Sequence, residues 1–286
     1  MKIEGVWLPV ITPFLNGSVD YSSYENLVNF YIARNVSGII PLATTGEGPT
    51  IGDDEFIKIV ELTIRIVNGR IPVYFGVGGN YTEKVISSLK LLHNYNFDGI
   101  LSVSPYYNRP SQEGIYEHFK KISESTDKNI IIYNIPYRTG RNIENETIFR
   151  LSELKNIIGI KDSCGDIKQS AELIFNKPEG FSVLTGEDLL FYITVAMGGD
   201  GGILAAAHIE TEKYLNIYSL IKNNNLDEAR RNWKDLLDII PLLFEEPNPR
   251  PIKYILKNKN LITSDETRLP ITDISDKLKK QLGRFF

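Results

Sequence analysis

The sequence contains the run Asn129-Ile130-Ile131-Ile132-Tyr133-Asn134, then an amphipathic stretch at Glu144–Leu154, and then the run Ile157-Ile158-Gly159-Ile160-Lys161. Both runs are almost continuously apolar and rich in isoleucine, which is typical of strands buried on both faces. The stretch between them has the apolar spacing of a helix. A strand, a helix and a second strand in this order predict a parallel βαβ unit.

The same unit repeats along most of the chain. The predicted strands are Val6–Thr12, Gly38–Ala43, Ile71–Gly76, Gly99–Val103, Asn129–Asn134, Ile157–Lys161, Phe181–Leu184 and Gly202–Ala206. The predicted helices between them are Tyr21–Arg34, Asp53–Val67, Thr82–Tyr95, Gln112–Ser125, Glu144–Leu154, Lys168–Phe175 and Leu189–Met197. Eight such units favour an α/β fold of the closed (β/α)₈ TIM-barrel type.

An open, doubly wound sheet is the alternative architecture. It would need a glycine-rich phosphate turn after the first strand, where this chain has Thr12-Pro13-Phe14. The run Gly76-Val77-Gly78-Gly79 lacks the third glycine and the later acidic residue of a dinucleotide site. We interpret it as a tight turn between a strand and a helix.

The pattern changes after Ala207. Helical segments follow one another without a strand between them: Ile209–Lys222, Asn225–Phe244, Arg250–Lys259 and Ile274–Leu282. The first would be the eighth helix of the barrel. The sequence therefore predicts a catalytic barrel over residues 1–222 and a C-terminal helical extension over residues 223–286.

Composition excludes several classes of protein. Hydrophobic residues make up 42% and charged residues 24% of the chain, with a formal net charge of −4, which indicates a globular protein without a nucleic-acid-binding surface. No apolar window is long enough for a membrane span, and the N-terminus lacks the apolar region of a signal peptide, so we expect a cytoplasmic protein. The single cysteine and the scattered His93, His118 and His208 predict neither a disulfide nor a protein-bound metal.

Lys161 is the strongest candidate for chemistry. It ends a buried strand, where loss of solvent disfavours the ammonium form and lowers the amine pKa, as a Schiff-base nucleophile requires. A lysine that only extends its amine to solvent is the alternative.

Other polar residues follow neighbouring strands, and a barrel collects such residues at one mouth. Tyr133 could shuttle protons beside the lysine, or simply fill the barrel. Thr44 and Thr45 could hold a carboxylate, or form an ordinary polar turn. Arg138 could bind a second carboxylate, or form a surface ion pair.

These residues occur within longer stretches that resemble the pyruvate-dependent class I aldolase family of dihydrodipicolinate synthase and N-acetylneuraminate lyase. The stretches are Thr44-Thr45-Gly46-Glu47, Ser104-Pro105-Tyr106-Tyr107-Asn108-Arg109-Pro110-Ser111-Gln112-Glu113-Gly114, Tyr133-Asn134-Ile135-Pro136, Arg138-Thr139-Gly140, Gly159-Ile160-Lys161, Glu246-Pro247-Asn248-Pro249 and Arg268-Leu269-Pro270. Their order and spacing extend over nearly the whole chain, and the likeness is greatest to the synthase branch. The resemblance implies a (β/α)₈ barrel that assembles as a homotetramer, a dimer of dimers.

The resemblance also implies a mechanism. Lys161 would form an imine with pyruvate, so the only cofactor-like group would be this covalent imine and no metal would be needed. Thr44 and Thr45 would hold the pyruvate carboxylate, and Ile203 would line the site through its backbone. Tyr133 would transfer protons through Thr45 and through Tyr107, which would reach into the site of a neighbouring subunit.

The second substrate implied is aspartate semialdehyde, whose carboxylate Arg138 would bind, and the product would be 4-hydroxy-tetrahydrodipicolinate, an intermediate of lysine and diaminopimelate biosynthesis. Two alternatives stay open. A 2-keto-3-deoxy sugar-acid aldolase, or a related pyruvate-dependent aldolase or dehydratase, would take a hydroxylated substrate, for which an arginine is a poor match. A catalytically silent barrel that binds a keto acid would have little need of Thr45, Tyr107, Tyr133 and Lys161 together.

Overall fold

The computed structural model describes residues 2–286, and the chain divides into two compact units. The first unit contains the chain up to Gly5 together with Tyr74–Ile203, and the second contains Val6–Val73 and Leu204–Phe286. The predicted division into residues 1–222 and 223–286 stays a prediction.

Within the described part of the chain, the long sheet has eight strands in the order β4-β1-β10-β9-β8-β7-β6-β5. The strands are β1 (Gly5–Leu8), β4 (Gly38–Ile39), β5 (Tyr74–Gly76), β6 (Gly99–Val103), β7 (Asn129–Asn134), β8 (Ile157–Asp162), β9 (Ser182–Thr185) and β10 (Gly201–Ile203). A parallel bridge joins Ile39 of β4 to Val73, the residue before β5. It pairs the two ends of the strand order, as closure of a barrel requires.

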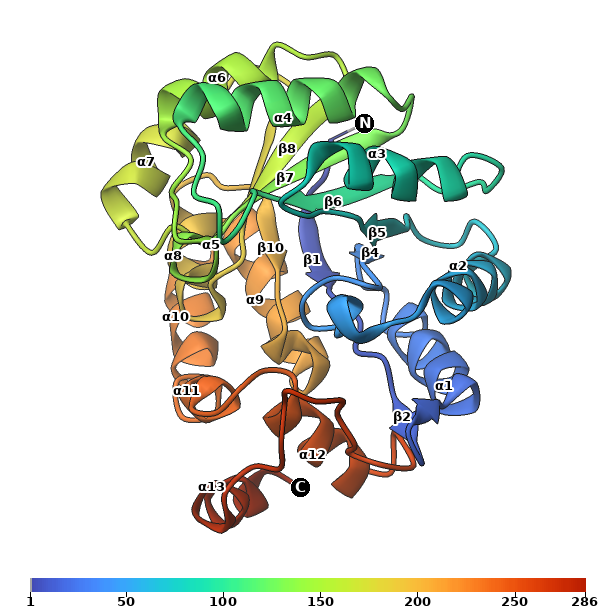
Figure 1. Cartoon of the computed structure of the whole chain (residues 1–286). Coiled ribbons are helices and arrows are strands. Elements are labelled where there is room, and N and C mark those ends of the chain that lie inside the picture. The colour runs from blue at the N-terminus through green and yellow to red at the C-terminus, as the bar shows by residue number, and fades with distance from the viewer. Residues whose placement is uncertain (1) are drawn as a thin grey trace. The chain divides into compact units, whose positions relative to one another are not determined.

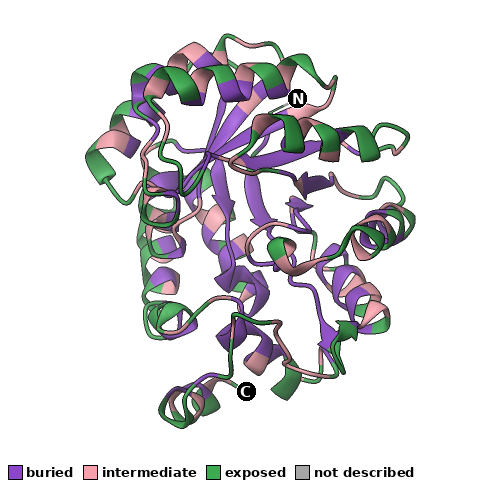
Figure 2. Ribbon diagram, viewed as in Figure 1, coloured by how far each residue is buried: buried purple, intermediate pink, exposed green. Residues whose placement is uncertain are grey.

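The first unit alternates strands with helices, as the apolar periodicity predicted (Figure 1). Strands β5 to β10 pair in parallel, and the register places Tyr133 of β7 beside Lys161 of β8, with Leu184 of β9 on its other side. The helices are α3 (Thr82–Leu91), α4 (Gln112–Glu124), α5 (Pro136–Thr139), α6 (Asn145–Ser152), α7 (Ile167–Asn176) and α8 (Phe191–Ala196). The strands are buried, and each long helix has buried residues on one face and exposed residues on the other (Figure 2).

The second unit holds β1 from Val6 onward, β4 and a short hairpin of β2 (Phe14–Leu15) and β3 (Ser18–Val19). Its helices are α1 (Tyr21–Ile32), α2 (Asp53–Val67), α9 (Thr211–Lys222), α10 (Leu226–Lys234), α11 (Ile240–Phe244), α12 (Arg250–Asn258) and α13 (Asp276–Leu282), with a 3₁₀ turn η1 (Gly48–Thr50) before α2. In the part of the chain from residue 2 onward, no helix combines the length and apolarity of a membrane span.

Several predicted boundaries were wrong. Strand β10, predicted to end at Ala206, ends at Ile203 with no proline nearby, whereas prolines explain the changes at three other strands and one helix. Strand β1 stops before Pro9, β4 stops before Pro41 and β5 begins after Pro72, because proline has no N–H to give to a sheet. The helix predicted over Asn225–Phe244 is two helices, α10 and α11, separated by turns at residues 235–239. Pro241 stands in the first turn of α11, where its missing N–H is tolerated, whereas inside one long helix it would break the ladder.

Candidate active site

The amine of Lys161 is buried beside an aromatic ring near the end of β8. The residue is only 6% exposed, and its strand β8 lies between β7 and β9 in the sheet. The Lys161 Nζ atom lies 4.2 Å from the centre of the Tyr133 ring, over its face. The structure thus brings together the two residues that the sequence placed at the centre of the chemistry.

Burial lowers the pKa of the Lys161 amine from its ordinary 10.5 to about 8. The carboxylates of Asp188 and Glu187 oppose this shift, while the positive charge of Arg138 adds to it. Burial also raises the pKa of Glu187, although the lysine counteracts that rise. A neutral amine is therefore available near neutral pH, which is the condition for attack on a carbonyl.

The phenol of Tyr133 remains protonated in this environment. The residue is 5% exposed, and burial raises its pKa well above the usual value, with Arg138 and Ser163 only partly opposing the rise. A protonated phenol beside an amine can donate a proton to an oxygen that leaves the carbon under attack.

Gly186 leaves the space that the lysine occupies. A Cβ atom at this position would be 2.4 Å from Cε of Lys161, far inside van der Waals contact. It would also be 2.3 Å from Oγ of Ser163. The backbone after β9 therefore packs directly against the lysine side chain, and only glycine allows that approach.

Arg138 is exposed on α5, immediately after β7. Its Nε atom donates to the Tyr137 hydroxyl at 3.2 Å, and no carboxylate of residues 2–286 forms a salt bridge with its guanidinium. Its charge does act on Glu187, where it lowers the pKa of the carboxyl. A guanidinium outside any salt bridge can still bind a carboxylate from solution. Its position is consistent with the predicted role and argues against the surface ion pair considered from the sequence.

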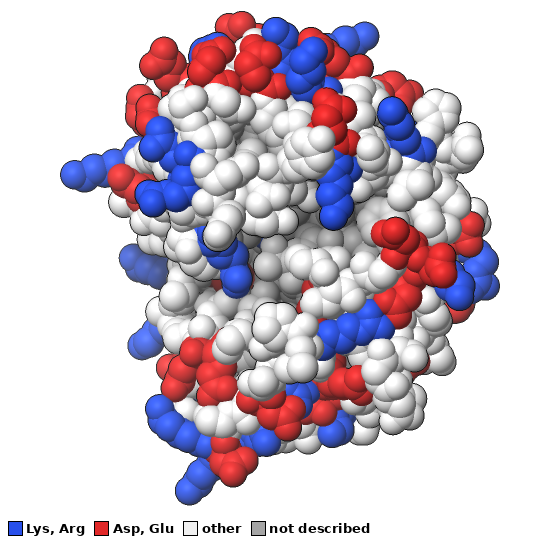
Figure 3. Space-filling model, in the orientation of Figure 1, with Lys and Arg blue, Asp and Glu red and all other residues white. Residues whose placement is uncertain are grey.

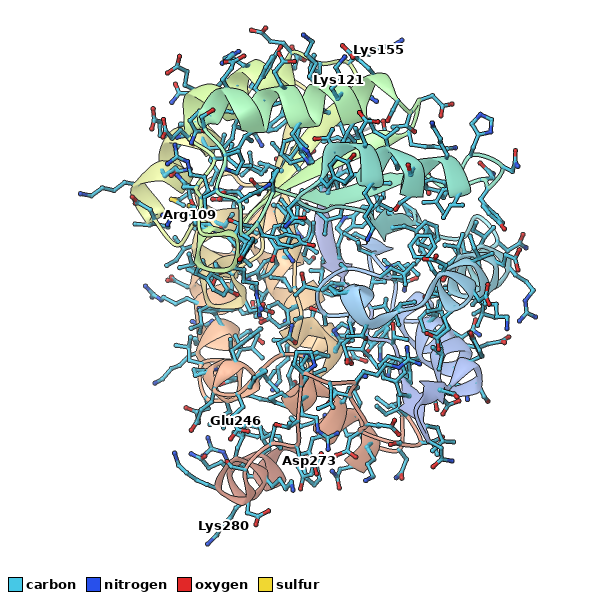
Figure 4. All side chains as sticks on the ribbon, in the orientation of Figure 1. Arg109, Lys121, Lys155, Glu246, Asp273 and Lys280 are labelled. Carbon is cyan, nitrogen blue, oxygen red and sulfur yellow. The ribbon has the colours of Figure 1, made fainter. Side chains whose placement is uncertain are left out.

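Tyr107 is 90% exposed and has a left-handed backbone, with φ of 72°. The two residues after it anchor the loop: Asn108 Nδ2 donates to the Asn80 carbonyl, and Nε of Arg109, labelled in Figure 4, donates to the Gly140 carbonyl, each at 2.9 Å. A large aromatic side chain on a fixed, strained turn can contact another molecule. Ile203, by contrast, is fully buried in β10.

Thr44 and Thr45 belong to the second unit, in a tight turn after β4. The Glu47 N–H donates to the Thr44 carbonyl at 3.1 Å and closes the turn. Thr45 is 4% exposed, and its hydroxyl accepts a hydrogen bond from Asn248 Nδ2 at 3.0 Å. The role predicted for these threonines at Lys161 stays a prediction.

The glycine and acidic residues after β9 were not predicted as site residues from the sequence. Gly186, Glu187 and Asp188 directly follow that strand, so the rule that selected Lys161 and Tyr133 also points to them. Asn248 was quoted only as part of a longer stretch, and nothing in the sequence identifies Thr45 as its partner.

Metal ligands do not gather in the described chain: residues 2–286 contain no group of three or more histidine, cysteine or carboxylate side chains that could hold an ion. Charges of both signs are intermingled over the face shown in Figure 3.

The family comparison covers almost the entire chain. The profile of the Dihydrodipicolinate synthetase family matches residues 2–286. A curated relative, 4-hydroxy-tetrahydrodipicolinate synthase 2 of Clostridium acetobutylicum, is 56% identical over 285 residues, which span 100% of both chains.

Solved structures show the same fold. A crystal structure of dihydrodipicolinate synthase from Thermotoga maritima superposes with a TM-score of 0.95 at 37% identity, over 99% of each chain. The chloride-inhibited dihydrodipicolinate synthase from Acinetobacter baumannii, complexed with pyruvate, gives a TM-score of 0.95 at 34% identity, over 99% of this chain and 97% of that one. Together with the strand order, these structures confirm the predicted (β/α)₈ barrel with a C-terminal helical extension.

Proposed function

Because this chain belongs to the dihydrodipicolinate synthetase family, we propose that it condenses pyruvate with aspartate semialdehyde to 4-hydroxy-tetrahydrodipicolinate. It is then a class I lyase that works through a covalent imine on Lys161. The observation that carries the proposal is the buried lysine, whose pKa is lowered to about 8 beside a protonated tyrosine.

The proposed reaction begins when neutral Lys161 attacks the ketone carbon of pyruvate. Tyr133 donates a proton to the departing hydroxyl, so that water leaves and the imine forms. Loss of a methyl proton from the imine then gives an enamine, whose carbon attacks the aldehyde of the second substrate. Ring closure through the amino group of that substrate finally releases the lysine.

The remaining residues have binding roles in the proposal. Thr44 and Thr45 hold the pyruvate carboxylate, and Thr45 and Tyr107 continue the proton path from Tyr133. Arg138 binds the carboxylate of aspartate semialdehyde, which its unpaired guanidinium supports. Ile203 lines the site through its backbone.

The assembly and the location belong to the same proposal. The exposed Tyr107 acts in a neighbouring subunit of a homotetramer, and the protein is cytoplasmic and acts without a metal or an organic cofactor. The exposure of Tyr107 on an anchored turn supports the subunit contact.

The proposal is tested by turnover and by trapping. In the turnover assay, purified protein is given pyruvate with either aspartate semialdehyde or glyceraldehyde, and the loss of pyruvate is followed. In the trapping assay, borohydride is added with pyruvate, and the modified peptide is identified by mass spectrometry. We expect consumption with aspartate semialdehyde and a mass increase on Lys161. Consumption with glyceraldehyde alone would indicate a sugar-acid aldolase, and trapping without any turnover would indicate a silent keto-acid-binding barrel.

Imine formation should become faster as the pH rises through about 8. Because burial lowers the pKa of Lys161 to about 8, roughly a tenth of the amine is neutral at pH 7, and most of it is neutral above pH 9. Rapid quenching of single-turnover mixtures into borohydride at pH 6.5 to 9.5 measures this rate. A rate that keeps rising tenfold per pH unit beyond pH 9 would show an unperturbed lysine.

The substitution Gly186→Ala should lower kcat/KM for pyruvate by roughly 10²-fold, because its Cβ would displace Cε of Lys161, and misplacing a reacting group by about 1 Å has an effect of this size. Steady-state kinetics measure the change. Gly283→Ala is the control, since its Cβ would meet nothing within 4 Å, and we expect it to leave the kinetics unchanged. Unaltered activity of Gly186→Ala would contradict the close approach.

A further inference from the structure

A buried charge cluster lies beneath the turn that carries Thr44 and Thr45. Glu47 is 2% exposed and Lys253 of α12 is fully buried, and the two form an ion pair. The other carboxylate oxygen of Glu47 accepts from the backbone N–H of Arg268 at 3.0 Å. Lys253 Nζ also donates to the carbonyl of Glu266 at 2.9 Å. Segments from the C-terminal part of the chain thus hold both oxygens of the carboxylate.

Packing around the cluster buries the Glu47–Lys253 pair, whereas the neighbouring Arg268–Glu55 pair is partly exposed. The ring of Phe14, itself fully buried, lies 4.2 Å from Lys253 Nζ and 4.4 Å from the guanidinium carbon of Arg268. The Arg268 guanidinium donates to the two carboxylate oxygens of Glu55, each at 2.6 Å. In such surroundings an ion pair is weakly screened, and its geometry is strongly enforced.

The cluster is joined directly to the backbone of the turn. Glu47 has a left-handed φ of 53°, and its N–H closes the turn on the Thr44 carbonyl. The next residue, Gly48, donates to the Ala43 carbonyl at 3.2 Å, and a Cβ there would be 2.2 Å from the Leu42 carbonyl oxygen. A glutamate in a left-handed conformation is strained, and such strain persists only where surrounding contacts enforce it. The ion pair with Lys253 is one of these contacts.

A second tie runs from the same C-terminal segment to the threonine side chain. Asn248 lies two residues before α12 and donates from Nδ2 to the Thr45 hydroxyl at 3.0 Å. Because the hydroxyl oxygen accepts this bond, its own hydrogen must be directed to a different acceptor. Asn248 therefore fixes the direction in which Thr45 can donate.

Helix α12 is itself held in place. Arg250, at its first position, pairs with Asp265 at 3.3 Å and with Asp273. Before the helix, the Glu246 carboxylate accepts from the Ser275 N–H at 2.9 Å (Figure 4). The helix can therefore act as a rigid support rather than as a loose cover.

We propose that Lys253 and Asn248 are positioning residues, through which the C-terminal helical region holds the Thr44–Thr45 turn in the geometry that binds the substrate carboxylate. The inference rests on the proposed function, in which this turn binds pyruvate. The turn would be set from two sides, by Lys253 acting on its backbone through Glu47 and by Asn248 acting on the Thr45 hydroxyl.

The test compares imine trapping of pyruvate with that of acetone, which replaces the carboxylate by a methyl group. The double variant Glu47→Gln/Lys253→Met removes both charges together, so that no unpaired charge is left buried. We expect its pyruvate-to-acetone ratio of trapping rates at Lys161 to fall at least about 10-fold, with the acetone rate within about twofold of the unmodified protein. Asn248→Ala should lower the same ratio and leave the fold intact.

The control is Lys177→Met/Asp200→Asn, which removes a lysine–carboxylate pair in the first unit, with a buried aspartate and a lysine that is 19% exposed. It should leave the ratio unchanged, and circular dichroism is used to check that each variant is folded. The inference is overturned if folded Glu47→Gln/Lys253→Met and folded Asn248→Ala both keep the original pyruvate-to-acetone ratio. It is also overturned if the ratio falls as much in the control as in these variants. In either case the proposed function stands. If the double variant does not fold, the trapping ratio of Asn248→Ala alone decides whether the inference holds. Absence of trapping in the unmodified protein would instead reject the proposed function.

Discussion

Replacing Lys161 by methionine is expected to lower kcat/KM at least about 10³-fold and to abolish borohydride trapping of pyruvate. Methionine has a similar length and fits an apolar site, so the loss would come from the missing amine rather than from a cavity. Turnover of pyruvate with aspartate semialdehyde measures the first effect, and the mass of the reduced protein measures the second. Residual turnover within tenfold of the unmodified protein would show that the reaction does not pass through this lysine.

The same substitution should stabilise the fold at neutral pH. Burial lowers the pKa of Lys161 from 10.5 to about 8, so between these values the unfolded chain binds more protons than the folded one, and stability rises with pH. Below pH 8 the folded state bears the full cost of the buried charge, on the order of 3 kcal/mol. Methionine removes that cost. Urea unfolding should therefore show a higher free energy of unfolding for the methionine variant at pH 7, and this difference should shrink between pH 8 and 10.5.

Tyr133→Phe is expected to have the second-largest effect, a loss of roughly 10²- to 10⁴-fold in kcat, which is the usual contribution of a positioned proton donor. The ring would still cover the lysine amine, so trapping of pyruvate at Lys161 should persist at a reduced rate. Single-turnover trapping separates this outcome from a general loss of the site.

The control is Tyr24→Phe, which removes another buried tyrosine hydroxyl, one bonded to Thr63 at 2.7 Å in the second unit. It should leave kcat within about twofold. If Tyr133→Phe and Tyr24→Phe reduce kcat equally, the hydroxyl of Tyr133 serves packing and not proton transfer.

Much of the fold was predictable because apolar periodicity is a local property. The limits of β6 and β7 were predicted without error, and β8 within one residue, since these strands are unbroken runs between clear turns. Some of the larger errors came where a proline interrupts an apolar run, as at Pro9 and Pro241. There the missing N–H outweighs the hydrophobic pattern.

The sequence by itself determined the repeat of strand and helix, and with it the position of Lys161 and Tyr133 at the ends of adjacent strands. That inference needs only the continuous apolar runs of buried strands, the 3.6-residue period of helices and the rule that parallel strands present their carboxyl ends together. The tertiary structure decided which distant groups act on these residues. Three interactions join segments that no local pattern connects. Gly186 approaches the lysine, Glu187 and Asp188 influence its pKa, and Lys253 pairs with Glu47 across 206 positions. Packing sets such contacts, because they depend on how each side chain fills the space that remote parts of the chain leave open.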